Sequence, residues 1–395
     1  MAKKMNMVVA QSGGPTMVIN QSLAGVVAEA RKDPRVGRIL GARHGVLGIL
    51  GGDYIDLRKL APRRLDAVAA TPSSALGSCR RKPSAADCRA MFAEFRRLNV
   101  AWFLYIGGND SADAARIVAE EAEREGWPLR VCHVPKTIDN DLRSCDHTPG
   151  FGSAARFVAC AVRGDDLDNR ALGGVKIDVV MGRDAGFLAA SSALARVRPD
   201  DGPHVICLPE RPFSERRFVA AVKAALAKYG RCVCVVSEGI RGRDGVPVAA
   251  RLGTGETDSH GNVQMSGSGA LGDALAALLR EKADVKRVRA DTFGYLQRSF
   301  PGIASATDSE EAFAAGAAAA KTVLGDGPCA ATVGIARAAS RRYSVAYVPM
   351  PIAEAAKTTR SMPDAFIAPS GFDVTPAFVE YAKPLAGSLP PCEIL

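Results

Sequence analysis

A lysine, a hydroxyl and two carboxylates are crowded into the short segment "PKTIDND", as Lys136, Thr137, Asp139 and Asp141. Charged groups so close together repel one another or must be desolvated together, so a solvated turn rarely needs this arrangement. A phosphoryl-transfer site does need it: one carboxylate takes the proton of an acceptor hydroxyl, a second holds Mg²⁺, and a cation balances phosphate charge. An aspartate that caps a helix would explain one of these carboxylates but not the whole set.

Two glycine-rich junctions could hold the phosphate itself: "SGGP" at residues 12–15 and "GGNDS" at residues 107–111. Glycine lets a backbone approach phosphate closely, and the helix that follows offers free N–H groups and the positive end of its dipole. Either junction also fits an ordinary tight turn between a strand and a helix. Neither contains a Walker A or a GxGxxG pattern.

Other polar segments supply groups that suit a sugar phosphate. Arg183 in "MGRDAG" could steady charge on a transferring phosphoryl group, although a surface salt bridge explains it equally well. Glu238 in "SEG" could accept hydrogen bonds from sugar hydroxyls. Further candidates for holding a phosphate are Arg80, Lys82, Arg289, Tyr295 and Arg298.

One pattern recurs along the chain and would position these residues: a short apolar strand, a polar junction and an Ala-rich helix. The strands are expected at "MNMVVA", "AWFLYI", "KIDVVM" and "RCVCVV". Strands that alternate with helices predict parallel βαβ units with helices on both faces of the sheet. Ligands of such sheets bind beyond the carboxyl ends of the strands, where these junctions fall.

The totals limit the class of protein. With 395 residues, 47% hydrophobic and 24% charged, the chain is long enough for two domains and a large core, and it lacks a low-complexity linker, so we expect intertwined domains. The net charge of +9 is spread without a dense basic tract, and no segment approaches a membrane span or a signal peptide. We therefore expect a cytoplasmic protein without nucleic-acid or membrane partners. Residues 241–270 are Gly-rich and predict a long irregular or hairpin region.

The ten cysteines and five histidines do not have metal-ligand spacing. Cys232 and Cys234 alternate along an expected strand and would face the same side of it. We interpret them as small apolar core residues in a reducing cytosol.

Taken in order, "SGGP", "GGNDS", "PKTIDND", "MGRDAG", "PERPF", "SEG" and "GYLQR" resemble the phosphofructokinase family. The resemblance spans roughly residues 5–305, and the combination of "PKTIDND" with "MGR" is highly specific. It implies an α/β fold of two Rossmann-like domains, each a mostly parallel sheet flanked by helices. Residues 1–150 plus about 300–345 would bind the phosphoryl donor, and residues 151–299 plus about 346–395 would bind the sugar phosphate.

The family's activity is phosphorylation of the 1-hydroxyl of fructose 6-phosphate to fructose 1,6-bisphosphate, in glycolysis and gluconeogenesis. By resemblance, Asp139 would be the base, Thr137 would contact the transferred group and Arg183 would stabilise charge in the transition state. The residues that would hold the sugar phosphate are Thr137, Asp139, Met181, Gly182, Arg183, Glu238, Arg289, Tyr295 and Arg298. The cofactor would be Mg²⁺, with Asn109, Asp110 and Asp141 as its ligands.

Two positions bear on the donor. ATP-dependent relatives have glycine before the TIDND run and glycine after GGD, where this chain has Lys136 and Asp110. Asp110 would take up the space of a nucleotide α-phosphate and repel it, by about 4 kcal/mol for two unit charges about 4 Å apart at an effective dielectric near 20. Lys136 would grip the phosphate that leaves. This pair marks the pyrophosphate-dependent members, so the resemblance implies pyrophosphate as donor, orthophosphate as product and near-reversible chemistry.

The donor-binding residues by this resemblance are Gly13, Gly14, Arg80, Lys82, Gly108, Asn109, Asp110 and Lys136. Asn109 stands where many relatives have a metal-ligating aspartate. Two effector-binding arginines of the bacterial ATP-dependent enzymes are Ala24 and Ala28 here, which predicts a non-allosteric enzyme. In relatives, an arginine in the strand before "MGR" grips the 6-phosphate from a neighbouring subunit; here it is replaced, and Lys176 is the nearest cation. The resemblance implies a homodimer or homotetramer.

Three alternatives remain open at this stage. One is an ATP-dependent phosphofructokinase that tolerates Asp110. Another is a catalytically silent binding protein of the same fold, against which the set Asp139, Asp141 and Arg183 argues. The last is a basic nucleic-acid binder, which salt-sensitive retention of DNA would favour.

Overall fold

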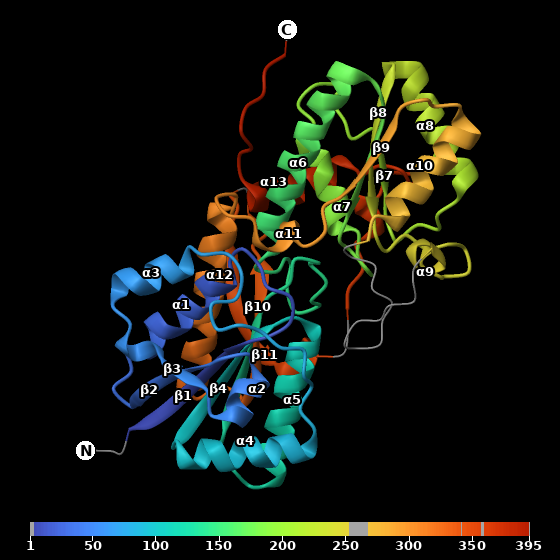
Figure 1. Cartoon of the computed structure of the whole chain (residues 1–395). Helices are drawn as coiled ribbons and strands as arrows, with labels where there is room; N and C mark the ends of the chain where they lie inside the picture. The colour runs from blue at the N-terminus through green and yellow to red at the C-terminus, as the bar shows by residue number, and fades with distance from the viewer. Residues whose placement is uncertain (1–3, 253–267, 341, 357–358, 395) are drawn as a thin grey trace. The chain divides into compact units, whose positions relative to one another are not determined.

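The computed structural model describes residues 4–252, 268–340, 342–356 and 359–394. The chain forms two compact units, each assembled from separate stretches of sequence (Figure 1). The first unit is Met1–Ile138, Leu142–Gly150 and Ala306–Arg360, and the second is Asp139–Asp141, Phe151–Ser305 and Ser361–Leu395. In the part of the chain described here, no helix has both the length and the apolar character needed to cross a bilayer.

The first unit is built on a seven-stranded sheet with the order β11-β10-β5-β4-β1-β2-β3. The two edge strands, β11 and β3, are antiparallel to their neighbours, and the inner pairs are parallel. The strands are β1 (Met5–Gln11), β2 (Val36–Ala42), β3 (Tyr54–Asp56), β4 (Val100–Gly107), β5 (Arg130–Pro135), β10 (Ala330–Arg337) and β11 (Val345–Pro351). Because β1, β4 and β5 are parallel neighbours, the junctions that follow them share one edge of the sheet.

Helices cover both faces of this sheet, as the alternation of its apolar residues requires. Met7 and Val9 of β1 pack in one core cluster and Val8 packs in another, on the opposite face. The helices are α1 (Ile19–Ala30), α2 (Val46–Gly51), α3 (Pro62–Ala69), α4 (Ala85–Arg97), α5 (Asn109–Arg124) and α12 (Ala306–Leu324), with the 3₁₀ helices η1 (Leu57–Lys59) and η3 (Ile352–Glu354). The expected sandwich of helices around a mostly parallel sheet is thus confirmed.

Helices α1 and α12 meet through glycines. A Cβ atom on Gly25 would lie 1.9 Å from the Phe313 carbonyl oxygen, and one on Gly316 would lie 2.0 Å from the Ser22 carbonyl oxygen. The two backbones therefore approach more closely than any side chain at these positions would allow.

The second unit is built on a four-stranded parallel sheet with the order β7-β8-β6-β9. Its strands are β6 (Gly174–Val180), β7 (Val205–Cys207), β8 (Arg231–Ser237) and β9 (Val288–Thr292). Its helices are α6 (Phe151–Leu172), α7 (Phe187–Ser191), α8 (Glu215–Tyr229), α9 (Val248–Leu252), α10 (Ala270–Ala283), α11 (Leu296–Ser299) and α13 (Pro376–Ala386), with the 3₁₀ helices η2 (Ser192–Ala195) and η4 (Asp364–Phe366). Cys232 and Cys234 are buried in its core with their Sγ atoms 3.6 Å apart, on one side of β8 as expected.

The region predicted to be irregular or a hairpin begins with a short antiparallel bridge between Arg241 and Pro247. It continues into α9, a helix that the weak periodicity did not predict. Residues 253–267 lie outside the described part of the chain.

Candidate active site

The polar junctions after β1, β4 and β5 meet at one edge of the first sheet. Ser12 donates its backbone N–H to the Ile106 carbonyl oxygen at 2.9 Å, and Lys136 donates its backbone N–H to the Gly107 carbonyl oxygen at 3.0 Å. A Cβ atom on Gly107 would lie 2.0 Å from the Ser111 hydroxyl oxygen, so no side chain fits at this position. The two glycine-rich junctions and the segment "PKT" are therefore neighbours.

Lys136 places a buried positive charge against the first junction. Its side chain is 3% exposed, and its Nζ donates to the Gly14 carbonyl oxygen at 2.5 Å. Gly13 has a φ of +74°, and a Cβ atom on it would lie 3.5 Å from the same Nζ. An ammonium group beside glycine backbone is the arrangement that suits a small anion such as phosphate.

Helix α5 begins one residue after Gly108 and carries Asp110, an exposed carboxylate, in its first turn. A carboxylate in this position is stabilised by the helix dipole and occupies the end of the helix that would otherwise attract an anion. Asn109 precedes it as the first residue of the helix.

Lys82 of the predicted donor set contacts α5 as well, through an ion pair of 2.5 Å with Asp113. Asp113 is also 2.8 Å from Arg116. Burial by itself would raise the pKa of Asp113, but the hydrogen bonds from Lys82 and Arg116 outweigh burial and lower it. Arg80, the other predicted cation of this segment, is exposed.

The backbone of Thr137 is held on both sides. Its N–H donates to the Pro149 carbonyl oxygen at 3.2 Å, and its carbonyl oxygen accepts from the Thr148 hydroxyl at 2.7 Å. The returning segment is anchored by His147, whose ring nitrogens lie 2.8 Å from Asp146 and 2.6 Å from Glu311. Burial opposes the charged form of His147, but these two carboxylates raise its pKa above the usual value.

His133 is a residue of this edge that the sequence did not single out. Its Nε2 donates to the Gly107 carbonyl oxygen at 2.8 Å, and its Nδ1 accepts from the Thr332 hydroxyl at 2.9 Å. Burial, with Lys136 adding to it, lowers the pKa of His133 to about 4, so the ring is neutral at physiological pH. A lone histidine within an apolar strand gives no sequence signal for this role.

Asp139, Asn140 and Asp141 belong to the second unit, although Thr137 and Ile138 belong to the first. Both aspartates are partly exposed, whereas Asn140 between them is fully buried. Asn140 has a φ of +60°, in the left-handed region, and donates from Nδ2 to the Tyr381 hydroxyl at 2.8 Å.

In the second unit, the loops after β6 and β8 are joined by hydrogen bonds. Glu238 donates its N–H to the Val180 carbonyl oxygen at 2.8 Å, and the Ser237 hydroxyl donates to the Gly182 carbonyl oxygen at 2.6 Å. A Cβ atom on Gly239 would lie 2.1 Å from the Arg183 carbonyl oxygen. The loops that carry Arg183 and Glu238 are thus in direct contact.

Gln297 ties the loop after β9 to the same edge. Its Oε1 accepts from the Met181 backbone N–H at 3.2 Å, and its Nε2 donates to the Gly294 carbonyl oxygen at 2.9 Å. The guanidinium of Arg298 lies over the Tyr295 ring, 5.0 Å from its centre. Of the predicted sugar-phosphate residues, this edge therefore gathers Met181, Gly182, Arg183, Glu238, Tyr295 and Arg298.

Arg289 does not lie at this edge of the second sheet. It is an exposed residue near the beginning of β9 and is in register with Lys176 on β6. Lys176 is 3.2 Å from Asp165 and also pairs with Asp291.

Asp165, Asp178 and Asp291 offer carboxylate oxygens that lie within 4.8 Å of one another, a spacing that could hold a metal ion. The predicted ligands Asn109, Asp110 and Asp141 are not part of this cluster. Asp178 is fully buried, and burial together with the negative charge of Asp165 raises its pKa well above the usual value. Lys176 already supplies positive charge to the two outer carboxylates.

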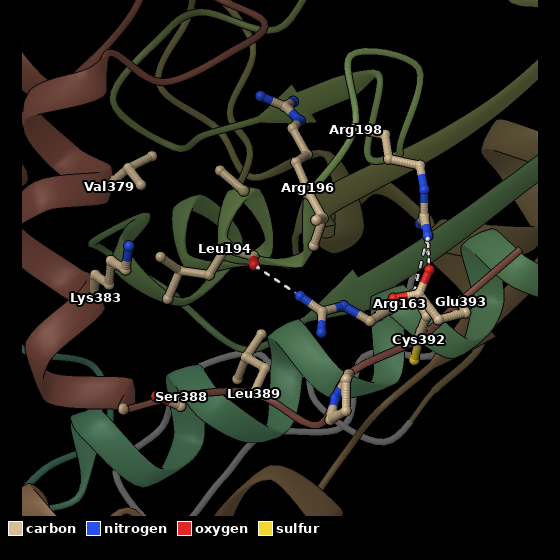
Figure 2. A pocket seen from close by; sticks show the side chains of 14 residues that line it. Arg163, Leu194, Arg196, Arg198, Val379, Lys383, Ser388, Leu389, Cys392 and Glu393 are labelled. Atoms are coloured by element: carbon tan, nitrogen blue, oxygen red, sulfur yellow. Dashed lines mark hydrogen bonds and ion pairs between the residues drawn. The ribbon is translucent and has the colours of Figure 1, made fainter.

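A separate cavity of about 420 Å³ lies in the second unit between α6, the residues after α7 and the C-terminal segment (Figure 2). Its lining includes Arg163, Arg198 and Lys383. It contains none of the predicted site residues.

Comparisons with known proteins bear on the whole chain. A phosphofructokinase family profile matches residues 6–323. A pyrophosphate–fructose 6-phosphate 1-phosphotransferase of Rhodospirillum rubrum is 51% identical over 97% of this chain and 95% of its own length. One of Xanthomonas campestris is 42% identical over 96% of this chain and 91% of its own length. The crystal structure of a pyrophosphate-dependent phosphofructokinase from Nitrosospira multiformis superposes with a TM-score of 0.87 at 34% identity, and the match covers 98% of this chain and 94% of that one.

Proposed function

Because this chain belongs to the phosphofructokinase family, we propose that it transfers a phosphoryl group from pyrophosphate to the 1-hydroxyl of fructose 6-phosphate. The products are fructose 1,6-bisphosphate and orthophosphate, and the reaction runs in both directions. The observation that carries the choice of donor is the ammonium group of Lys136, buried against Gly13 and Gly14 at the edge where the first turn of α5 carries Asp110.

The donor edge distinguishes a small anion from a nucleotide by charge. Lys136 and the backbone around Gly13 and Gly108 provide positive potential for two linked phosphates. Asp110 opposes a third negative group at the start of α5, where a nucleotide would place its α-phosphate. Lys82 forms an ion pair with Asp113 of α5 and adds positive charge beside this edge.

The acceptor chemistry belongs to Asp139, Thr137 and Arg183. As the 1-oxygen attacks phosphorus, Asp139 accepts the hydroxyl proton and the bond between phosphorus and the leaving phosphate breaks. Thr137 contacts the group in transit, and Arg183 neutralises the charge that develops on it. Lys136 compensates the charge on the orthophosphate that leaves.

The oxygen ligands Asn109, Asp110 and Asp141 suit Mg²⁺, which prefers carboxylate and amide oxygens together with substrate phosphates. When bound, the ion neutralises pyrophosphate charge. Asp110 is exposed in the first turn of α5, and Asp141 is partly exposed.

The sugar phosphate is held at the carboxyl edge of the second sheet. Glu238 and the backbone of Met181 and Gly182 contact the sugar, while Arg298 and Tyr295 contact its 6-phosphate. These residues lie at one edge of the second sheet, where Gln297 and Gly239 contact the loop that follows β6. This shared location supports the assignment.

Arg289 is assigned to the 6-phosphate of a second copy of the chain, in a homodimer or homotetramer. Its exposed place near the beginning of β9, away from the edge with Glu238 and Arg298, supports a role outside its own subunit. The proposed location of the protein is the cytoplasm.

Initial rates with fructose 6-phosphate and Mg²⁺, measured in parallel with pyrophosphate and with ATP, test the proposal. Turnover with pyrophosphate and none with ATP is the expected result. Turnover with ATP alone would leave the acceptor chemistry in place and overturn the roles of Lys136 and Asp110. No turnover with either donor would favour a silent binding protein.

A further inference from the structure

Asn140, between the two carboxylates of the segment "PKTIDND", has an unusual backbone conformation. Its φ is +60°, a left-handed value that non-glycine residues adopt at a cost and that asparagine tolerates better than most. The residue is fully buried. The carboxylates on either side of it therefore depend on a backbone conformation that must be held in place by its surroundings.

A hydroxyl group from the far end of the chain contacts that residue. The Nδ2 of Asn140 donates to the Tyr381 hydroxyl oxygen at 2.8 Å, in the interior of the second unit. Because a buried amide without a partner is unfavourable, this hydrogen bond favours the left-handed conformation over alternatives that would turn Asn140 elsewhere.

The ring of Tyr381 contacts a second functional segment. Its centre lies 6.3 Å from that of Phe187, the first residue of α7, which directly follows the loop with Arg183. It also lies 6.5 Å from Phe151 and 5.1 Å from Phe366. One residue of α13 thus contacts the segment of Asp139 through its hydroxyl and the segment of Arg183 through its ring.

We propose that Tyr381 is a positioning residue that fixes Asp139 and Asp141 through Asn140 and aligns them with the loop of Arg183. The inference rests on the proposed function, and it extends the active-site machinery beyond residues 6–323, which the family profile matches. Tyr381 acts through Asn140 and Phe187.

The opposite side of α13 provides a matched control. Val379 and Lys383 line the cavity of about 420 Å³ together with Arg163 and Leu194, as Figure 2 shows. A change of Lys383 therefore alters the same helix without touching the contacts of Tyr381 described above.

The test is Tyr381→Phe, which removes the hydroxyl and keeps the ring. We expect kcat to fall by about ten- to a hundredfold, as small misplacements of reacting groups do, while the KM for both substrates changes less than about threefold. Circular dichroism and a small shift in Tm would show that the fold is intact. Lys383→Ala should keep wild-type kcat.

A double-mutant cycle separates positioning from general weakening of the structure. Asn140→Gly retains access to the left-handed conformation and removes the amide. If Tyr381 acts through Asn140, adding Tyr381→Phe to Asn140→Gly lowers kcat no further. Additive losses, or a Tyr381→Phe enzyme with wild-type kcat, would overturn the inference.

The role of Tyr381 and the proposed function can be tested separately. If the wild-type enzyme turns over with pyrophosphate and Tyr381→Phe has the same kcat, the role of Tyr381 is overturned and the proposed function stands. A wild-type enzyme that uses ATP instead overturns the donor and still tests Tyr381 with that donor. A wild-type protein without turnover overturns both.

Discussion

The carboxyl edge of the first sheet and that of the second sheet are each stabilised in a different way. The donor edge of the first unit is fixed by backbone contacts around Gly13 and Gly107 and by the buried side chains of Lys136 and His133. The acceptor edge of the second unit has Gly239 in close contact with the Arg183 backbone, but it also depends on side chains from distant segments, Gln297 and Tyr381. The contacts of the first edge come from the motifs themselves and from His133 on the strand that leads into "PKT", whereas the second edge also requires Tyr381, which lies far from any motif.

The largest effect is expected from removing the base. Asp139→Ala should lower kcat by about two to four orders of magnitude, because general-base catalysis contributes that much, and should largely spare substrate binding. Steady-state kinetics together with a binding titration of fructose 6-phosphate would check this. Equal losses of kcat and binding would mean damage to the fold.

Glycine substitutions test the comparison of the two edges directly. Gly107→Ala places a Cβ atom 2.0 Å from the Ser111 hydroxyl oxygen, and Gly239→Ala places one 2.1 Å from the Arg183 carbonyl oxygen. We expect the first change to raise mainly the KM for pyrophosphate and the second mainly the KM for fructose 6-phosphate, each by about tenfold or more, since displaced groups lose their alignment.

The matched control is Gly164→Ala, at a helical position of α6 with no atom within 4 Å of the added Cβ. This variant should keep wild-type kinetics and gain slightly in stability, as alanine does over glycine in helices. If Gly107→Ala and Gly239→Ala affected both substrates alike, the division into a donor edge and an acceptor edge would be wrong.

A smaller effect is expected for donor selection. Asp110→Gly removes the carboxylate that opposes a nucleotide, so the ratio of activity with ATP to activity with pyrophosphate should rise about tenfold or more. Because Asp110 is exposed, solvent and salt screen its charge. The gain in ATP use should therefore be well below what the repulsion between two buried charges would give. Rates with ATP and with pyrophosphate at increasing ionic strength would measure the change in donor preference. An unchanged preference for pyrophosphate would argue that Lys136 alone selects the donor.

The smallest effect concerns stability and pH. Burial and Asp165 raise the pKa of Asp178 in the folded protein above 3.8, so folding becomes less favourable as the pH rises from about 4 through the folded-state pKa. Asp178→Asn removes this cost, about 1.4 kcal/mol for each unit of the shift. The free energy of unfolding of the Asp178→Asn variant, relative to that of the wild type, should therefore be higher at pH 8 than at pH 5. Denaturant unfolding at the two pH values would measure it. A difference that does not depend on pH would contradict the stated cause.

The fold class, the family and the transferase activity could be predicted from the sequence, and they are confirmed. The glycine-rich junctions and "PKTIDND" were visible because their chemistry lies within a few neighbouring residues. His133 and Tyr381 were not predicted, since a buried polar residue in an apolar or aromatic context carries no signal until its partner is known. Gln297 lies within "GYLQR", but its contact with Met181 could not be predicted from that motif. The position of Arg289 was equally hidden, because register between β9 and β6 is set by pairing of strands far apart in the chain.

Most of the proposed residue roles depend on the identity of the phosphoryl donor. The most direct test mixes the protein with fructose 1,6-bisphosphate, orthophosphate and Mg²⁺ and follows the phosphorus species by ³¹P NMR without any nucleotide present. We predict that pyrophosphate and fructose 6-phosphate appear together. Their absence, with formation of ATP once ADP is supplied, would contradict the assignment of Lys136 and Asp110 as the residues that select pyrophosphate.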